Sequence, residues 1–355
     1  MFRFGIFSGG TGYPFRTRMA VIEKIRKGAS FQQLGLMLVI LFLAVVNTRF
    51  AGTHLDHVEG RVVNNFLNAS TLLQIFTDTS FFAIMAVGMT AVIVSAGIDL
   101  SVGSIYALCG VSLALLMRAN PGLNPVVALA ATLGVGVLAG LINGTAVASL
   151  GVHPFIITLG TMWIYRGVAF VATKAESILV PESMNHLLKT GMPGRPDLHP
   201  VATLAMLAVV FVGGVYLTRT VYGRRIFAVG GNVDAARYSA LPIGKILCGV
   251  YVVSGLTAGV ASFLSTCYYG SASSGDGQGY ELYVIASAVV GGASLTGGKG
   301  TAIGAFLGAL LIVMIRQSIR TLRLDSNYEW IIIGFAIIIA VVFDRLSARR
   351  RKVVA

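Results

Sequence analysis

The chain has 355 residues, of which 55% are hydrophobic and 12% are charged, and its formal net charge is +13. Soluble domains carry roughly 25% charged residues, so this composition excludes a soluble protein and indicates an integral membrane protein. The positive charge does not indicate nucleic-acid binding, because sixteen of the 27 lysines and arginines lie in three short patches that one membrane face can share.

The three basic patches are residues 1–27, the central loop 219–245 and the tail from residue 344. Cytoplasmic segments of membrane proteins carry an excess of Lys and Arg, so we expect all three patches and both chain ends in the cytoplasm. The expected organisation is a basic cytoplasmic N-terminal segment (1–30), a transmembrane domain (31–345) and a basic cytoplasmic tail (346–355).

Long apolar runs alternate with polar segments along the chain. Within lipid a helix satisfies its own backbone, so we expect an all-α polytopic membrane protein of about ten transmembrane helices, six before the central loop and four after it. Pro154 is expected to divide the uncharged stretch 119–165 into two spans. The other expected spans are 32–48, 79–98, 100–117, 200–218, a run from 246, 282–298, 300–315 and 330–343.

The polar segments between these spans are expected outside the membrane, at residues 49–78, 174–199, 270–280 and 316–329. Taken together they are close to neutral, as the positive-inside rule requires. The disagreeing feature is the last segment, which places Arg316, Arg320 and Arg323 on the outer side.

An internal echo suggests two related helix bundles. Gly97-Ile-Asp-Leu-Ser-Val-Gly103 recurs in altered form as Gly292-Ala-Ser-Leu-Thr-Gly-Gly298. Each copy lies between a span that enters from outside and a span that returns. Repeats with broken helices near a central pathway are typical of transporters, so the echo favours a transport function.

Within the central loop, residues 231–243 are predicted to form a short cytoplasmic helix. Asn232 is a good N-cap, Ala235 and Ala236 favour helix, and Pro242 stops it. Such a helix is a handle by which another protein can move this one. The alternative is a solvated linker that is basic only to fix the topology.

Polar residues inside the apolar runs are candidates for a substrate pathway or for structural hydrogen bonds. Asp99 is ionisable at membrane depth, which indicates function by default. We favour a second interpretation, in which Asp99 and Ser101 cap the helix that begins there. Arg166 needs a carboxylate, a carbonyl or water, and a structural partner is favoured. Asn143 and Thr158 are suited to hydrogen bonds between helices.

No catalytic apparatus is recognisable in the sequence. Gly297-Gly-Lys-Gly300 lacks the remainder of a phosphate-binding loop, and there is no metal-ligand cluster or nucleophile–base pair. Cys109, Cys248 and Cys267 lie in or beside apolar runs and are expected to be small core residues. We therefore expect a transport subunit that is not an enzyme, holds no metal or cofactor and does not hydrolyse ATP itself.

Four long stretches resemble the membrane permease of the ABC sugar importers for ribose, galactose, arabinose and xylose: 88–108, 141–170, 222–243 and 279–301. The resemblance extends from about Phe31 to Arg345. It implies the ABC importer permease fold in a bacterial inner membrane, and a second permease copy or a sister permease. It also implies an extracytoplasmic sugar-binding protein outside and two ATPase subunits, which bind the ATP, inside.

The stretch Asn232–Ile243 matches the coupling segment that the family rests on its ATPase. The resemblance thus implies that the ATPase-coupling residues are Tyr222, Gly223, Arg224, Gly231, Asn232, Ala235, Ala236 and Arg237. The chain departs from the family where Ala240 replaces a usual Gly before a hydrophobic residue, and where Ala96 replaces a common Gly.

The sequence is therefore interpreted as an importer permease for a monosaccharide, with the sugar left open. The expected pathway or structural polar residues are Asp99, Ser101, Asn143, Thr158 and Arg166. The alternative is a secondary transporter or channel that acts without an ATPase, although such a carrier usually shows more paired charges in the membrane. A membrane-embedded enzyme lacks candidate residues. Pairing with a second copy and pairing with a sister permease both stay open.

Overall fold

The structure is a computed structural model that describes residues 15–56, 60–193, 195–325, 327–336, 338, 339 and 342. Among these residues, eight helices are long and apolar enough to cross a membrane. They are α1 (Phe15–Phe50, apolar from Gln32), α2 (Ala69–Val94), α3 (Val102–Ala119), α4 (Pro125–Leu150), α5 (Pro154–Thr173), α7 (Val201–Arg219), α10 (Ile243–Tyr269) and α12 (Ala302–Thr321).

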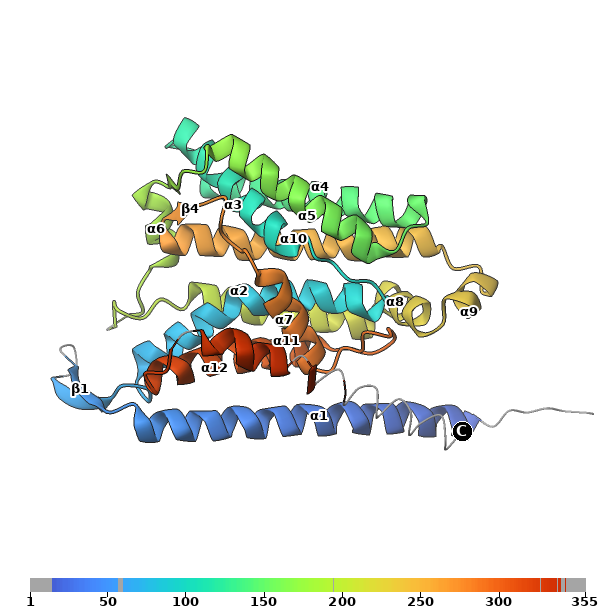
Figure 1. The fold of residues 1–355 in the computed structure, drawn as a ribbon, viewed down its shortest axis with the longest axis horizontal. Helices are drawn as coiled ribbons and strands as arrows, with labels where there is room; N and C mark the ends of the chain where they lie inside the picture. Colours follow the sequence, from blue (N-terminus) through green and yellow to red (C-terminus); the bar gives the residue numbers. More distant parts are fainter. Residues whose placement is uncertain are drawn as a thin grey trace, which may run out of the picture.

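The other described elements are short. They are the helices α6 (Glu182–Leu188), α8 (Val221–Gly231), α9 (Val233–Tyr238) and α11 (Tyr280–Val290), and the strands β1 (Thr53–Asp56), β2 (Arg61–Asn64), β3 (Ile178–Leu179) and β4 (Ser271–Ala272). β1 pairs with β2 and β3 with β4, both antiparallel. Figure 1 shows β1, β4 and α6 at one end of the long helices, and α8 and α9 at the other.

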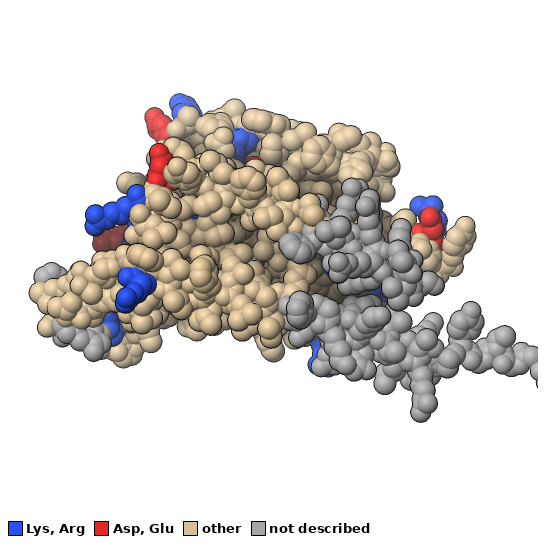
Figure 2. Space-filling model, turned by 60° about the horizontal axis from the view of Figure 1, so that its bottom comes forward, with Lys and Arg blue, Asp and Glu red and all other residues tan. Residues whose placement is uncertain are grey.

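The long helices are stacked in an order that Figure 1 shows clearly. α4 packs on α10, α10 on α2, α2 on α12, and α12 on α1. Every residue of α2 from Thr79 to Val94 is buried, as expected for a helix that is apolar all round and lies inside a bundle. In Figure 2 the charged side chains of one face lie mainly toward the two ends, with a largely uncharged band between them. This distribution suits a bundle that crosses a lipid bilayer.

The sequence predicted the order of the spans, and eight of the ten expected spans are long apolar helices among the described residues. Six long helices precede the central loop, and the division of 119–165 is confirmed: Gly151 ends α4 with φ of +65° and Pro154 begins α5. α10, α12 and the 11-residue apolar α11 follow the loop. Residues 328–336 are helical within the last expected span, 330–343. The end of that span, the tail 346–355 and the first 14 residues lie outside the described part.

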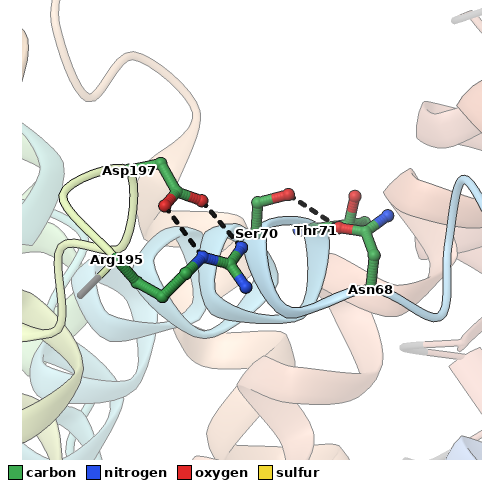
Figure 3. A network of polar contacts seen from close by, with 5 residues as sticks. All are labelled: Asn68, Ser70, Thr71, Arg195 and Asp197. Atoms are coloured by element: carbon green, nitrogen blue, oxygen red, sulfur yellow. Dashed lines mark hydrogen bonds and ion pairs between the residues drawn. The ribbon is translucent and has the colours of Figure 1, made fainter. Parts of the chain in front are cut away.

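Two expected spans have wrong boundaries. The span 79–98 is shifted, because α2 begins at Ala69: the Asn68 side chain accepts the Thr71 N–H at 2.8 Å and the Ser70 hydroxyl at 2.7 Å (Figure 3). α2 then ends at Val94, before Ala96, whose φ is +64°. The span 282–298 is too long, because α11 ends at Val290 and a loop with several positive-φ glycines follows.

Arg316 is accommodated by its own side-chain contacts. Its guanidinium forms an ion pair with Glu329 and lies 4.9 Å from the ring centroid of Phe82 and 4.3 Å from that of Tyr283. A cation held in this way over aromatic faces is stabilised without a negatively charged outer loop. The positive-inside rule counts Lys and Arg residues whatever their partners, so all three arginines still disagree with an outer placement of this segment.

α4 and α10 touch through their backbones. Gly136, Gly140 and Gly144 lie one turn apart on the buried side of α4. A Cβ added at Gly140 would overlap the carbonyl oxygen of Tyr251, and one added at Gly144 would lie 2.6 Å from the carbonyl oxygen of Cys248. Small residues at this spacing allow the close backbone approach that holds helices together in lipid, where the hydrophobic effect between helices is absent.

This contact predicts opposite outcomes for two alanine substitutions on the same helix. Gly140→Ala should lower the free energy of unfolding by about 1–3 kcal/mol, because the added methyl forces α4 and α10 apart. Gly134→Ala should be neutral or slightly stabilising, because no atom lies within 4 Å of its added Cβ. Thermal unfolding in detergent measures both. Equal melting temperatures for the two variants would contradict the backbone contact.

Candidate functional site

The central loop contains two short capped helices. The Thr220 hydroxyl accepts the N–H of Gly223 at 2.9 Å at the start of α8, and the Asn232 side chain accepts the N–H of Ala235 at 2.9 Å at the start of α9. The predicted helix with Asn232 as its N-cap is therefore confirmed. It ends at Tyr238, earlier than the expected stop at Pro242, and Ala240 follows with φ of +54°.

α8 is not among the elements expected from the sequence. Its buried residues include Ile226, Val229 and Gly230, while Arg224 and Arg225 are exposed, so it is an amphipathic helix. The apolar spacing of three to four residues was the signal that could have revealed it. The arginines led instead to the interpretation of the segment as a polar loop.

The expected coupling residues divide into a surface set and a buried set. The exposed ones are Arg224, Gly231, Asn232, Ala235 and Arg237. Tyr222 is half-buried, and its hydroxyl donates to the carbonyl oxygen of Lys245 at 2.8 Å. Gly223 is buried, because its backbone lies against the end of α7.

Ala236 is not on the surface, contrary to the expectation that it forms part of a docking surface. Its side chain is only 4% exposed and belongs to the main hydrophobic core, so it anchors α9 to the bundle. The residue that the sequence analysis missed is Tyr238, whose side chain is 91% exposed at the end of α9. Large exposed aromatic side chains are frequent anchors of protein interfaces.

The end of α8 touches the breaks between two pairs of helices. The N–H of Gly298, in the loop between α11 and α12, donates to the carbonyl oxygen of Val94 at the end of α2, at 2.8 Å. A Cβ added at Gly230 would overlap that carbonyl oxygen and lie 3.0 Å from the Gly298 nitrogen. We call this contact of Val94, Gly230 and Gly298 the backbone junction. The junction places Gly298, the last residue of the repeated motif at 292–298, against Val94, which lies three residues before the matching motif at 97–103.

Four of the predicted polar residues converge just beyond this junction, where α3 begins. One carboxylate oxygen of Asp99 accepts the Ser101 N–H at 2.9 Å and the Ser101 hydroxyl at 2.6 Å. Asn143 on α4 donates to the Ser101 hydroxyl oxygen at 2.7 Å. Thr158 on α5 donates to the carbonyl oxygen of Ile98 at 3.3 Å. Asp99 thus holds the turn that precedes α3 from a fully buried position. The expected capping of α3 by Asp99 and Ser101 is wrong, because the N-cap residue Ser101 makes no side-chain cap bond and Asp99 bonds to Ser101 and not to the first turn of the helix.

Three further residues that the sequence did not single out complete this network. The Ser254 hydroxyl on α10 donates to the second Asp99 oxygen at 2.7 Å, and the Tyr251 hydroxyl donates to the Ile98 carbonyl at 3.2 Å. Tyr165 donates to the Asn143 side-chain oxygen at 3.1 Å. The network therefore ties α3, α4, α5 and α10 to one interrupted stretch of chain, because buried polar groups in lipid must find partners inside the protein.

Arg166 lies apart from this network. Its guanidinium donates to the carbonyl oxygens of Ser274 at 2.6 Å and Asp276 at 2.5 Å. These carbonyls belong to the segment 270–279 that joins α10 to α11, which was expected to lie outside the membrane. The segment instead turns inward, where Gly277 packs against Gly103 at the start of α3. Arg166 holds it there through backbone carbonyls.

The described residues contain no group of three or more His, Cys, Asp or Glu side chains placed to hold a metal ion. Cys109 and Cys267 are buried and Cys248 is half-buried, and all three are free thiols. The site is thus built of hydrogen bonds and backbone contacts.

Comparison with known proteins identifies the family. Residues 71–342 match the family described as "Branched-chain amino acid transport system / permease component". The D-allose transport system permease protein AlsC of Escherichia coli K12 is 38% identical over 80% of this chain and 86% of its own length. The ribose import permease protein RbsC of the same strain is 36% identical over 88% and 93%. No solved structure gives a significant match.

A third relative is named for a different transported molecule. The autoinducer 2 import system permease protein LsrD of Photorhabdus temperata is 34% identical over 81% of this chain and 86% of its own length. These matches confirm the resemblance to the permeases of ribose-type ABC importers, which are transport components and not enzymes.

The Asp99 contacts predict how two substitutions should differ. Asp99→Asn should keep most stability and transport, because its amide oxygen still accepts from Ser101 and its amide N–H can donate to the Ser254 hydroxyl. Asp99→Leu should lose about 3 kcal/mol or more, because it leaves the Ser101 N–H and the Ser254 hydroxyl without their acceptor. Melting temperature and solute uptake are measured together. An Asp99→Asn variant that melts like the wild type but transports nothing would show that the charge acts directly in transport.

Proposed function

The chain belongs to the family of branched-chain amino acid transport system permease components, and on this premise we propose that it is the membrane-spanning subunit of an ATP-driven monosaccharide importer. The sugar class is supported by relatives named for D-allose and ribose, which match at least 80% of this chain. The observation that carries the proposed coupling is that the end of α8, in the helix pair α8–α9, lies directly against both helix breaks.

The proposed complex contains partners on both membrane faces. Two ATPase subunits, which bind the ATP, dock on α8 and α9, and an extracytoplasmic sugar-binding protein docks at the opposite end. A second permease copy or a sister permease completes the pathway. Support for the inner docking site comes from exposed Arg224, Arg237 and Tyr238 on one short helical platform. Arg and Tyr are the residue types that most often anchor interfaces.

Force passes from the ATPase to the membrane through α8 in this proposal. Ala236 fixes α9 to the core, and the buried face of α8 lies on the helix bundle. A displacement of this platform moves Gly230, and Gly230 is in contact with the end of α2 and the loop before α12. The end of α2 and the loop before α12 therefore move together when the platform is displaced. A coordinated movement of this kind can open and close a path between two helix bundles.

The proposed orientation places α9 in the cytoplasm and β3 outside, and thiol labelling in intact cells tests it. Ala235→Cys, on the exposed side of α9, should resist a membrane-impermeant maleimide until the cells are opened. Leu179→Cys, at a position whose side chain is 75% exposed, should react from outside. External labelling of Ala235→Cys would overturn the orientation.

Transport by the reconstituted complex tests the proposed function itself. Proteoliposomes that contain the chain, its ATPase and its binding protein should accumulate D-ribose or D-allose only when ATP is on the ATPase side. Accumulation by the chain alone, independent of ATPase and ATP, would support the secondary transporter or channel. A catalytically inactive ATPase serves as the control for sugar that merely binds.

Tyr238→Ala should weaken the association with the ATPase by more than about tenfold, since interface anchors of this kind contribute about 2 kcal/mol or more. Co-purification and ATPase stimulation report the effect. The matched control is Tyr328→Ala, which removes another exposed tyrosine (51% exposed) after α12, and it should leave the association unchanged. Unchanged binding in Tyr238→Ala would remove α9 from the interface.

A further inference from the structure

A polar cavity lies beside the inward-turning segment 270–279. Its volume is about 460 Å³, within the range of pockets that hold small molecules. The side chains that line it include Tyr106, Ser265, Tyr269, Asp276, Gln278 and Tyr280. Tyr106 lies on the second turn of α3, so the cavity adjoins the start of the helix that follows the Asp99 turn.

The walls of the cavity are held in place by contacts outside it. Arg166 fixes the backbone at Asp276, and the Asp276 carboxylate accepts the N–H of Ser273 at 2.8 Å. Tyr106 is hydrogen-bonded to Ser265, and its ring centroid is 5.4 Å from that of Tyr280. Such support keeps aromatic faces and polar groups in a fixed arrangement before any ligand arrives, which lowers the entropy cost of binding.

The residues that line the cavity indicate which chemical class of ligand it can bind. Asp276 is a strong acceptor, and Gln278 and the tyrosine hydroxyls both donate and accept hydrogen bonds. An apolar ligand would leave these groups without partners, and an anion would be repelled by Asp276. A neutral polyhydroxylated molecule satisfies them with its hydroxyls while its C–H faces lie against the tyrosine rings. A monosaccharide has both features.

We propose that this cavity is a monosaccharide-binding site within the permease, occupied as the sugar leaves the binding protein and before it passes the Asp99 network. The inference rests on the proposed function, because it takes the cargo to be a sugar. The permease chain then has its own specificity-determining sugar site, in which Gln278 and Asp276 bind the hydroxyl groups of the sugar.

Protection from thiol labelling tests the site without the partners. The test uses the purified full-length Gly275→Cys variant, because Gly275 lines the cavity, is exposed and has room for a side chain, and the change leaves Gln278 and Asp276 in place. The variant is treated with a maleimide in the presence of D-ribose, D-allose or betaine, a solute without hydroxyls. We expect at least one sugar to slow labelling at least threefold in the millimolar range, and betaine to have no effect. The matched control is Leu179→Cys, which lies outside the cavity and should label equally under all conditions. Equal labelling of Gly275→Cys with and without sugar, or equal protection by betaine, would overturn the proposal.

A transport measurement in the full complex gives the second, independent readout. Gln278→Ala should reduce the rate of sugar uptake at least fivefold at saturating binding protein, while the ATPase is still stimulated. Gln317→Ala, the same change on α12 away from the cavity lining, should transport like the wild type.

The two readouts separate two kinds of failure. Normal ATP-dependent uptake by Gln278→Ala, together with unprotected Gly275→Cys, would overturn the cavity as a sugar site and leave the importer intact. A wild-type complex without ATP-dependent uptake would overturn the importer, and the labelling result would then decide the cavity alone.

Discussion

A hydrogen bond between the Gly298 N–H and the Val94 carbonyl oxygen, with Gly230 packed against both groups, is the contact on which the rest of the structure depends. It joins the end of α2 to the loop before α12, and it admits no side chain at residue 230. The platform α8–α9 therefore reaches the centre of the bundle through backbone atoms at Gly230, in addition to the buried side chains of Ile226, Val229 and Ala236. Backbone contacts of this kind are stiff, and a stiff contact transmits displacement.

The buried charges serve the interrupted backbone near this junction. Asp99 accepts hydrogen bonds at the start of α3, and Arg166 donates to carbonyls of the segment 270–279. Non-helical chain at membrane depth must satisfy its polar groups within the protein. Asp99 does this for the turn before α3, and Arg166 does it for the segment 270–279. The two pieces of chain are in contact with each other, because Gly277 packs against Gly103. The hydrogen bond from Arg166 to the Asp276 carbonyl oxygen also fixes one wall of the polar cavity.

Much of this arrangement was predictable from local sequence. Apolar runs gave the order of the spans, Gly151 and Pro154 gave the α4–α5 division, and Asn232 gave the N-cap of α9. The two departures from the family pattern, Ala96 and Ala240, both adopt the left-handed conformation that glycine favours. What local sequence does not encode is which distant elements meet.

The convergence of Asp99, Asn143 and Thr158 is a tertiary result, because their spacing along the chain shows no pattern. The burial of Ala236 and the inward turn of 270–279 are tertiary results as well. The most direct test of the central claim is the number of sugar molecules imported per ATP hydrolysed by assembled complexes that carry Gly230→Ala or Gly134→Ala. The junction predicts a ratio reduced at least fivefold for Gly230→Ala and a wild-type ratio for Gly134→Ala, whose added Cβ has no atom within 4 Å. An unchanged ratio in a stably assembled Gly230→Ala complex would contradict the account.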